Sequence, residues 1–158
     1  MTGSSDLIRR FHAGEPEAFH HVLEEHKDDV YALCLRCVGP RQAETVAEQV
    51  FLHAHQAMHR LDVATEIRPW LLRLAVDLVG EHESGEEDDL PPRSALIQRI
   101  LGELEPNFRT AVVLRDILRL TEDEVAEVLE LPLGTARSRI HRGRLTLARN
   151  MSPHLDEV

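Results

Sequence analysis

The stretch TEDEVAEVLELPLGTARSRIHRGRLTLARN, residues 121–150, decides the fold of this chain. Thr121 and Glu124 form a T-x-x-E capping box, a pattern that predicts the start of a helix. Residues 130–133, with a proline among them, interrupt that short helix, and residues 134–135 begin a second one. Two helices joined by so short a turn predict a helix-turn-helix, a unit whose second helix enters the major groove of DNA.

The second helix of this unit is strongly basic. Residues 131–150 contain five arginines and no acidic residue. The clearest apolar positions of that helix are Ile140, Leu145 and Leu147. Four of the arginines lie too close together for all of them to face a core, so we expect several to form a positive surface: Arg137, Arg139, Arg142 and Arg144.

The charge of the whole chain points the other way. The 158 residues include 28 Asp and Glu against 18 Lys and Arg, for a formal net charge of −10. An acidic total disfavours nucleic-acid binding, because affinity for phosphates comes mostly from Lys and Arg. Seven of the acids, however, lie in residues 77–92, which contain no base. The net charge therefore describes this middle segment more than it describes the basic helix.

The acidic segment also predicts the domain organisation. Residues 80–93, GEHESGEEDDLPPR, combine like charges with Gly, Ser and a Pro-Pro pair. Such a segment buries too little apolar surface to offset the entropy of ordering it, so we expect a flexible linker. The expected division is a helical bundle in residues 1–79, a helix-turn-helix domain in residues 94–152 and a tail in residues 153–158.

The rest of the chain has helical periodicity and no sustained alternation, so the predicted fold class is all-α. Pro16 and Pro106 occupy first-turn positions of two expected helices, and Gly39-Pro40 ends the first of them. Further helices are expected over residues 42–59, from Pro69 onward and after Ser94. The prediction is two small helical domains joined by the acidic linker.

Several function classes lack support in the sequence. No apolar stretch approaches the ~20 residues of a membrane span, and the N-terminus has no apolar signal core. Two cysteines are too few for a disulfide scaffold, which favours a cytoplasmic location. A phosphate-binding glycine loop, a nucleophile elbow and paired catalytic carboxylates are missing, so we expect neither an enzyme nor a cofactor.

Two small clusters of potential metal ligands have alternative interpretations. Cys34 and Cys37 form a C-x-x-C on one helix face, which suits core packing better than a redox or metal site. His55 and His59 have the i,i+4 spacing of zinc ligands, but no acid lies between them. With His53 they are interpreted as surface histidines, and no metal is expected.

The motifs together resemble a known family. Residues 131–144, LPLGTARSRIHRGR, closely resemble the recognition-helix motif of region 4 in extracytoplasmic-function (ECF, group IV) RNA polymerase sigma factors. The segments around Leu104-Glu105-Pro106 and Leu114-Arg115-Asp116 fit the same region. The N-terminal part resembles region 2 through Val50-Phe51-Leu52 and through Trp70-Leu71-Leu72-Arg73-Leu74-Ala75.

This resemblance implies a bacterial transcription factor that binds core RNA polymerase and promoter double-stranded DNA. It also implies control by an anti-sigma factor, with no membrane and no small-molecule substrate involved. The residues that fall where the family reads the −35 element are Thr135, Arg137, Ser138, Arg139, His141 and Arg142. Those at its polymerase-binding positions are Glu44, Glu48, Gln49 and Phe51, and those of its −10 region are Arg68, Trp70 and Arg73.

Region 2 diverges from the family pattern where DNA is melted. Val76-Asp77 stands where the family typically has Arg-Asn, and carboxylates there repel a DNA backbone. The loop of residues 61–68, expected to hold a flipped −10 base, contains no aromatic residue for stacking, and Trp70 is interpreted as a core residue. Two alternatives therefore stay open. One is a sigma-like regulator or polymerase accessory subunit without melting activity, and the other is a mimic that titrates an anti-sigma factor.

Overall fold

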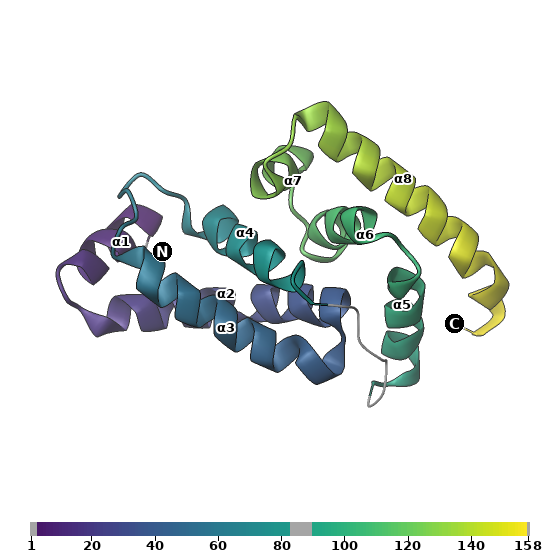
Figure 1. The fold of residues 1–158 in the computed structure, drawn as a ribbon, viewed down its shortest axis with the longest axis horizontal. Helices are drawn as coiled ribbons and strands as arrows, with labels where there is room; N and C mark the ends of the chain where they lie inside the picture. Colours follow the sequence, from purple (N-terminus) through teal and green to yellow (C-terminus); the bar gives the residue numbers. More distant parts are fainter. Residues whose placement is uncertain (1–2, 83–89, 158) are drawn as a thin grey trace.

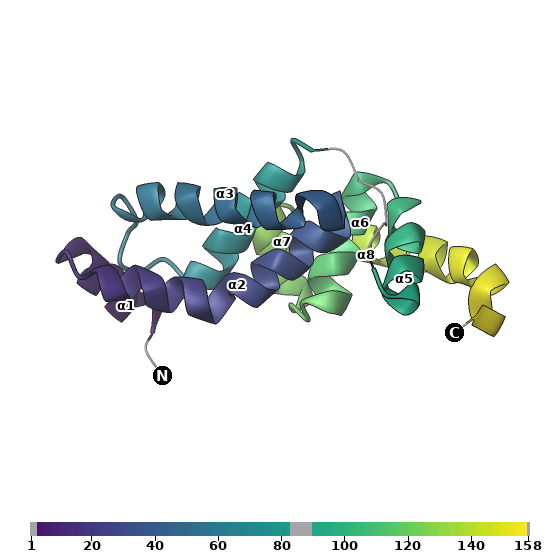
Figure 2. The same ribbon diagram turned by 90° about the horizontal axis from the view of Figure 1, so that it is seen from below.

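The computed structural model describes residues 3–82 and 90–157, and every regular element within those ranges is helical, as predicted (Figures 1 and 2). Four helices precede the acidic segment: α1 (Ser4–His12), α2 (Pro16–Val38), α3 (Pro40–Met58) and α4 (Ile67–Val79). The elements after it are α5 (Pro92–Gly102), α6 (Pro106–Val112), η1 (Val113–Ile117), α7 (Glu122–Leu129), α8 (Leu133–Met151) and η2 (Ser152–Glu157).

The first four helices form one bundle, at the left of Figure 1. The long helices α2 and α3 pack along each other and α4 lies against both. The break between α2 and α3 was predicted at Gly39-Pro40. Gly39 has a φ of 89°, a conformation that favours glycine, and Pro40 is the first residue of α3. The helix therefore begins two residues before the expected Gln42.

Helix α1 was not expected from the sequence, and it fixes the loop before α4. Its residues Leu7, Ile8 and Phe11 are buried in the bundle core. The Ser5 hydroxyl donates to the Val63 carbonyl at 2.9 Å, and the Ser4 hydroxyl accepts from the backbone N–H of Ile67 at 3.1 Å. Since that N–H is satisfied, α4 begins at Ile67 and not at the expected Pro69.

In the C-terminal group, α8 packs closely against α6 (right of Figure 1). Gly143 is buried at the crossing, and a Cβ placed there would lie 2.4 Å from Val112 Cγ2 and 3.2 Å from the Phe108 carbonyl oxygen. The absence of a side chain at position 143 therefore sets the distance between the two helices. Arg109, also buried, donates to the carbonyls of Leu101 and Leu104 at 2.9 Å each, which secures the turn between α5 and α6.

Helix α6 continues into a π-helical segment that the sequence does not predict. Over η1 a hydrogen bond spans five residues instead of four, from the Leu118 N–H to the Val113 carbonyl at 3.0 Å. Arg119 follows with a left-handed φ of 61°, and Arg115 donates to the Leu120 carbonyl at 3.0 Å. The segment turns the chain sharply before α7 and leaves the Leu118 carbonyl facing the first bundle, where Arg68 donates to it.

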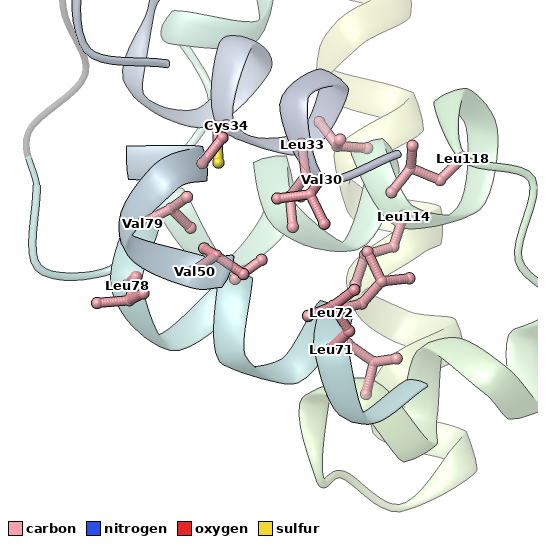
Figure 3. Close-up of a cluster of buried hydrophobic side chains, with 14 of the residues drawn as sticks. Val30, Leu33, Cys34, Val50, Leu71, Leu72, Leu78, Val79, Leu114 and Leu118 are labelled. Carbon is pink, nitrogen blue, oxygen red and sulfur yellow. The ribbon is translucent and has the colours of Figure 1, made fainter. Parts of the chain in front are cut away.

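The two groups of helices share one apolar interior. Figure 3 shows Val30 and Leu33 of α2, Leu72 of α4 and Leu114 of η1 within a single cluster of buried side chains. Helix α7 lies directly against α4, and η1 lies against α2. Half of the expected linker, residues 83–89 of 80–93, lies outside the described part of the chain, and its last two residues, Pro92 and Arg93, belong to α5.

Two further helices begin slightly earlier than expected. Helix α5 starts at Pro92, a proline at its first turn, and α8 starts at Leu133 after Pro132 as its cap residue.

None of the helices in the described ranges is both long enough and apolar enough to cross a bilayer.

Candidate nucleic-acid interface

The turn between α7 and α8 is fixed by local hydrogen bonds. The predicted capping box is present: the Glu124 N–H donates to the Thr121 hydroxyl, and the Thr121 N–H donates to the Glu124 carboxylate, each at 3.1 Å. At the other end, Glu130 adopts a left-handed φ of 55°, and the Leu131 N–H bonds the Ala126 carbonyl at 2.9 Å. The capping box therefore confirms the predicted start of α7, and the turn sets the direction of α8.

Helix α8 has one buried face and one open face. Ala136, Ile140 and Gly143 are buried against α6 and α7. The predicted −35 residues lie on the remaining surface, where Arg139 is half-buried and the other five are exposed: Thr135, Arg137, Ser138, His141 and Arg142. The structure therefore brings together all six residues singled out in this helix.

The arginines of α8 differ in their partners. Arg144 forms a bidentate ion pair with Asp116, in which Nε lies 2.9 Å from Oδ2. Arg137 Nε lies 3.5 Å from Glu122 Oε2. Arg139 and Arg142 have no side-chain ion pair with any other described residue. Their guanidinium groups are therefore available to a ligand, and their geometry suits guanine O6 and N7 or phosphate oxygens.

A second feature is a groove of about 970 Å³ lined by α2 and α3. Its lining is largely apolar, with Glu44 and Glu48 among it and Phe51 at its floor, buried. Three of the four predicted polymerase-binding residues thus line one surface, whereas Gln49 is half-buried and outside the lining. The groove is also lined by the exposed side chains of Tyr31 and Leu52, which were not among the predicted polymerase-binding residues.

The predicted −10 residues lie on α4, and two of them, Arg68 and Arg73, contact the C-terminal group. Arg68 donates from Nε to Asp29 Oδ2 at 3.1 Å and from Nη2 to the Leu118 carbonyl at 3.0 Å. A third contact joins Arg68 Nη1 to Glu124 Oε2 at 3.8 Å. Two of these three partners belong to η1–α7, so this arginine bridges the two halves of the molecule.

Arg73 makes a similar bridge one and a half turns further along α4. Its Nη2 donates to the Glu127 carbonyl at 3.0 Å, and its Nη1 lies 2.7 Å from Glu130 Oε1. The Nε of Arg73 is buried and has no hydrogen-bond partner among the described residues. Trp70 is half-buried against the core, in agreement with its interpretation as a packing residue. No signal in the sequence identifies Glu130 or the two carbonyls as partners of these arginines.

The cysteine pair lies in the core, and the three clustered histidines lie at the surface. Cys34 and Cys37 are buried free thiols, and burial raises the pKa of Cys34 to about 12 and that of Cys37 to about 11. Protonated, buried thiols confirm the core interpretation. His53, His55 and His59 are exposed, and the last two contact the Phe11 ring at centroid distances of 5.4 and 4.6 Å. Within the described ranges, no three His, Cys, Asp or Glu residues are grouped so as to hold a metal ion.

Sequence comparisons place these features in a family context. The family profile described as Sigma-70, region 4 matches residues 94–147, which include α5 to most of α8. The ECF RNA polymerase sigma factor SigW of Bacillus subtilis is 28% identical over 91% of this chain and 94% of its own length. The RNA polymerase sigma-H factor of Pseudomonas aeruginosa is 26% identical over 96% of this chain and 95% of its own length.

Solved structures share the fold. CnrH, in a complex with the cytosolic domain of CnrY, superposes with a TM-score of 0.84 at 22% identity, covering 95% of this chain and 97% of its own. The sigma factor RpoE of Bartonella quintana, in complex with the anti-sigma factor NepR, gives a TM-score of 0.69 at 14% identity over 84% and 96% of the two chains. The helix-turn-helix part of the chain therefore matches Sigma-70 region 4, and ECF RNA polymerase sigma factors are similar to the chain over nearly its whole length.

Proposed function

We propose that the chain binds core RNA polymerase and directs it to promoters whose −35 element is read by α8. The observation that carries this proposal is the open face of α8, which presents six polar residues on a helix-turn-helix, two of them arginines without an ion pair to any described residue. The factor supplies specificity and leaves the chemistry of RNA synthesis to the polymerase. It therefore acts where the polymerase acts, in the cytoplasm.

Recognition of the −35 element follows from the geometry of α8. The N-terminal half of the helix enters the major groove, as in other helix-turn-helix units. Arg139 and Arg142 donate to guanine edges, while Thr135 and Ser138 bond phosphate oxygens or base edges. Arg137 exchanges its contact with Glu122 for a phosphate, at small cost because that ion pair is exposed. His141 completes the polar face.

Polymerase binding is assigned to the groove between α2 and α3. Its apolar lining supplies contact area, and Glu44 and Glu48 supply negative charge that suits a basic or amphipathic helix of the polymerase. An anti-sigma factor that covers this groove would compete with the polymerase for the same surface. One structural relative is a sigma factor solved in complex with an anti-sigma factor, which supports control of this kind.

The −10 element is assigned to α4, with Arg68 and Arg73 as phosphate contacts and Trp70 as the support that orients them. The proposed boundaries remain residues 1–79 for the polymerase-binding and −10 domain, 80–93 for the linker and 94–152 for the −35 domain. One observation favours an alternative without melting activity: Asp77, where the family has a polar or basic residue, is exposed on α4 and faces any DNA backbone laid along that helix.

The test is reconstitution with a bacterial core RNA polymerase. The holoenzyme selects duplexes from a library with randomised −35 and −10 blocks, and selected duplexes then serve as templates for run-off transcription. We expect enrichment of a defined −35 block and a run-off transcript. Permanganate footprinting on the same templates separates the alternative, since a −35 footprint without reactive thymines indicates binding without melting. Failure to enrich any block would refute the proposal.

A further inference from the structure

A cluster of four rings lies at one end of the α2–α3 groove. Phe11 of α1 and Phe19 of α2 pack against His55 of α3 and against His59, which directly follows α3. Phe19 and His55 also line the groove. The cluster belongs to the end of the bundle that carries α1, away from α5 to α8 (Figure 1). It therefore adds a feature to the groove that is independent of the C-terminal group.

The ring of His55 has aromatic neighbours on several sides. Its centroid lies 4.8 Å from that of Phe19 and 5.4 Å from that of Phe11, with interplanar angles of 89° and 86°. The His59 ring is 5.9 Å away at 88°. Perpendicular contacts of this kind are favourable for aromatic rings, so they restrict the rotation of the imidazole although His55 is exposed. The imidazole is thus a positioned part of the groove wall.

The groove is acidic when this histidine is neutral. The charged residues that line it are Asp28, Glu44, Glu48 and Lys27, three carboxylates against one amine. Lys27 donates to Glu24 at 2.9 Å, and this hydrogen bond raises the pKa of the amine, so Lys27 keeps its proton. A partner with positive side chains is therefore favoured along the whole groove.

The other titratable groups close to His55 are also histidines. His59 contacts it, His12 of α1 is bonded to a main-chain carbonyl at 3.0 Å, and His20 of α2 lies near Glu24. None of these three lines the groove, and α4, which also packs on α3, contributes no lining residue. Carboxylates, phenols and amines ordinarily titrate well below or above neutral pH. Among the described lining residues, His55 is therefore the one whose side chain ordinarily changes charge near neutral pH.

We infer that His55 is a further polymerase-contact residue of the groove, and that tight binding requires its neutral form. A protonated imidazole places a positive charge at the end of the groove, where it repels the basic helix assigned to this surface. Proton and polymerase then weaken the binding of each other, so the affinity for core polymerase falls as the pH drops. The inference rests on the proposed function, because it takes the groove as the polymerase-binding surface.

The test compares the full chain with three single variants. His55→Phe keeps a ring for the contacts with Phe11 and Phe19 and removes the group that binds a proton. His55→Lys keeps a positive charge at this position across the pH range. The matched control is His53→Gln, an exposed histidine on the same helix that lies outside the groove lining. Circular dichroism checks that each variant is folded, and His55→Gln takes the place of His55→Phe if the latter does not fold.

Biolayer interferometry with bacterial core RNA polymerase measures the dissociation constants between about pH 5.5 and pH 8, at an ionic strength of about 0.1 M. The readout is the ratio of the dissociation constant at the lowest pH to that at the highest. We expect this ratio to be about fivefold larger for the parent than for His55→Phe, and His53→Gln to match the parent. The comparison with His55→Phe removes the pH dependence of the polymerase itself.

Two further measurements report the charge directly. At the highest pH, His55→Lys should bind core polymerase about fivefold more weakly than His55→Phe. Calorimetric titration in two buffers with different enthalpies of ionisation counts the protons exchanged on binding. At about pH 6 the parent should release more protons than His55→Phe, a difference that a purely structural role of the ring would not produce.

Three results would overturn the inference: equal ratios for the parent and His55→Phe, equal affinities of His55→Lys and His55→Phe at the highest pH, or a ratio for His53→Gln as small as that of His55→Phe. Run-off transcription at the highest pH separates these failures from failure of the proposed function. If transcripts form while the ratios are equal, the role of His55 is wrong and the sigma activity stands. If the parent binds no core polymerase at any pH and gives no transcript, the proposed function itself is wrong.

Discussion

The arginines of α8 and those of α4 are assigned to the same ligand, yet the structure treats them in opposite ways. On α8, Arg139 and Arg142 have no ion pair with a described residue. On α4, Arg68 and Arg73 are engaged by carbonyls and carboxylates from distant parts of the chain. A positively charged residue at a DNA-binding position can therefore be accessible to the ligand, or it can be bound to protein carbonyls and carboxylates that take the place of phosphate.

The difference follows from where each helix lies. Helix α8 is at the outer side of the C-terminal group and buries only one face (Figure 1). Helix α4 packs against α2, α3 and α7, and its two half-buried arginines, Arg68 and Arg73, have partners inside the protein. The outer helix is therefore suited to the first contact with duplex DNA, and the inner helix to a later one.

The largest expected effect is a loss of DNA affinity on removal of Arg139 and Arg142, which have no ion pair with a described residue. Arg139→Ala with Arg142→Ala should weaken binding of the holoenzyme to its selected −35 duplex by at least about thirtyfold, since a good bidentate contact contributes about 1–3 kcal/mol. Fluorescence anisotropy at fixed salt measures the dissociation constant. Arg144→Ala is the matched control, because Arg144 is already paired with Asp116, and its effect should stay within about threefold. Equal losses in both would place the DNA surface elsewhere.

The next effect tests how α8 is positioned. Gly143→Ala places a Cβ within 2.4 Å of Val112 Cγ2, so the free energy of unfolding should fall by about 1–3 kcal/mol. Gly134→Ala is the control in the same helix, since its added Cβ meets nothing within 4 Å. Chemical denaturation followed by circular dichroism measures both. A Gly143→Ala protein as stable as the parent would mean that α6 and α8 separate easily.

A smaller effect compares the two sets of arginines as structural residues. Arg68→Ala removes hydrogen bonds to Asp29 and Leu118 and should lower the free energy of unfolding by about 1 kcal/mol, because these bonds are only partly buried. Arg142→Ala removes no ion pair among described residues and should change it by less than about 0.5 kcal/mol. The same denaturation experiment decides. Equal values would mean that the α4 contacts contribute nothing to stability.

The smallest expected effect is a pH dependence of the stability, which arises from His26 close to Arg68. His26 is buried on α2, and burial lowers its pKa, with Arg68 lowering it further and Glu25 and Asp29 opposing. The unfolded chain therefore binds a proton more readily than the folded one, so stability from this group falls as the pH drops below about 6.5. Urea midpoints between pH 5 and 8 should show a shallower decline for His26→Gln.

His141→Gln on the exposed face of α8 is the control for this measurement, and it should follow the parent. A decline of the same slope in all three proteins would exclude His26 as its source.

Local signals predicted much of this molecule. The capping box at Thr121 and Glu124, the break at Gly39-Pro40 and the prolines that open α2 and α6 each act within a few residues, and each prediction is confirmed. The arginine-rich face of α8 was predicted for the same reason. Of the apolar positions named for this helix, Ile140 is buried and Leu145 is 54% exposed, whereas the small residues Ala136 and Gly143 complete the buried face.

The features that sequence analysis missed depend on distant contacts. Helix α1 is short, and what stabilises it is the burial of Leu7, Ile8 and Phe11 in the bundle core together with the hydrogen bonds of Ser4 and Ser5 to residues about 60 positions later. The partners of Arg68 and Arg73 are about 50 residues away in sequence, and two of them are main-chain carbonyls, which every residue has. The π-helical segment likewise has no composition that distinguishes it from an ordinary helix end.

The crossing of α6 and α8 also has an evolutionary consequence. The space beside Gly143 is filled by the Val112 side chain and by the main chain at Phe108. The side chains at positions 112 and 143 therefore cannot change size independently of each other. Residues 112 and 143 should therefore vary together among natural relatives, with a larger side chain at 143 accompanied by a smaller one at 112. An alignment of related sequences would show this compensation as covariation between the two positions.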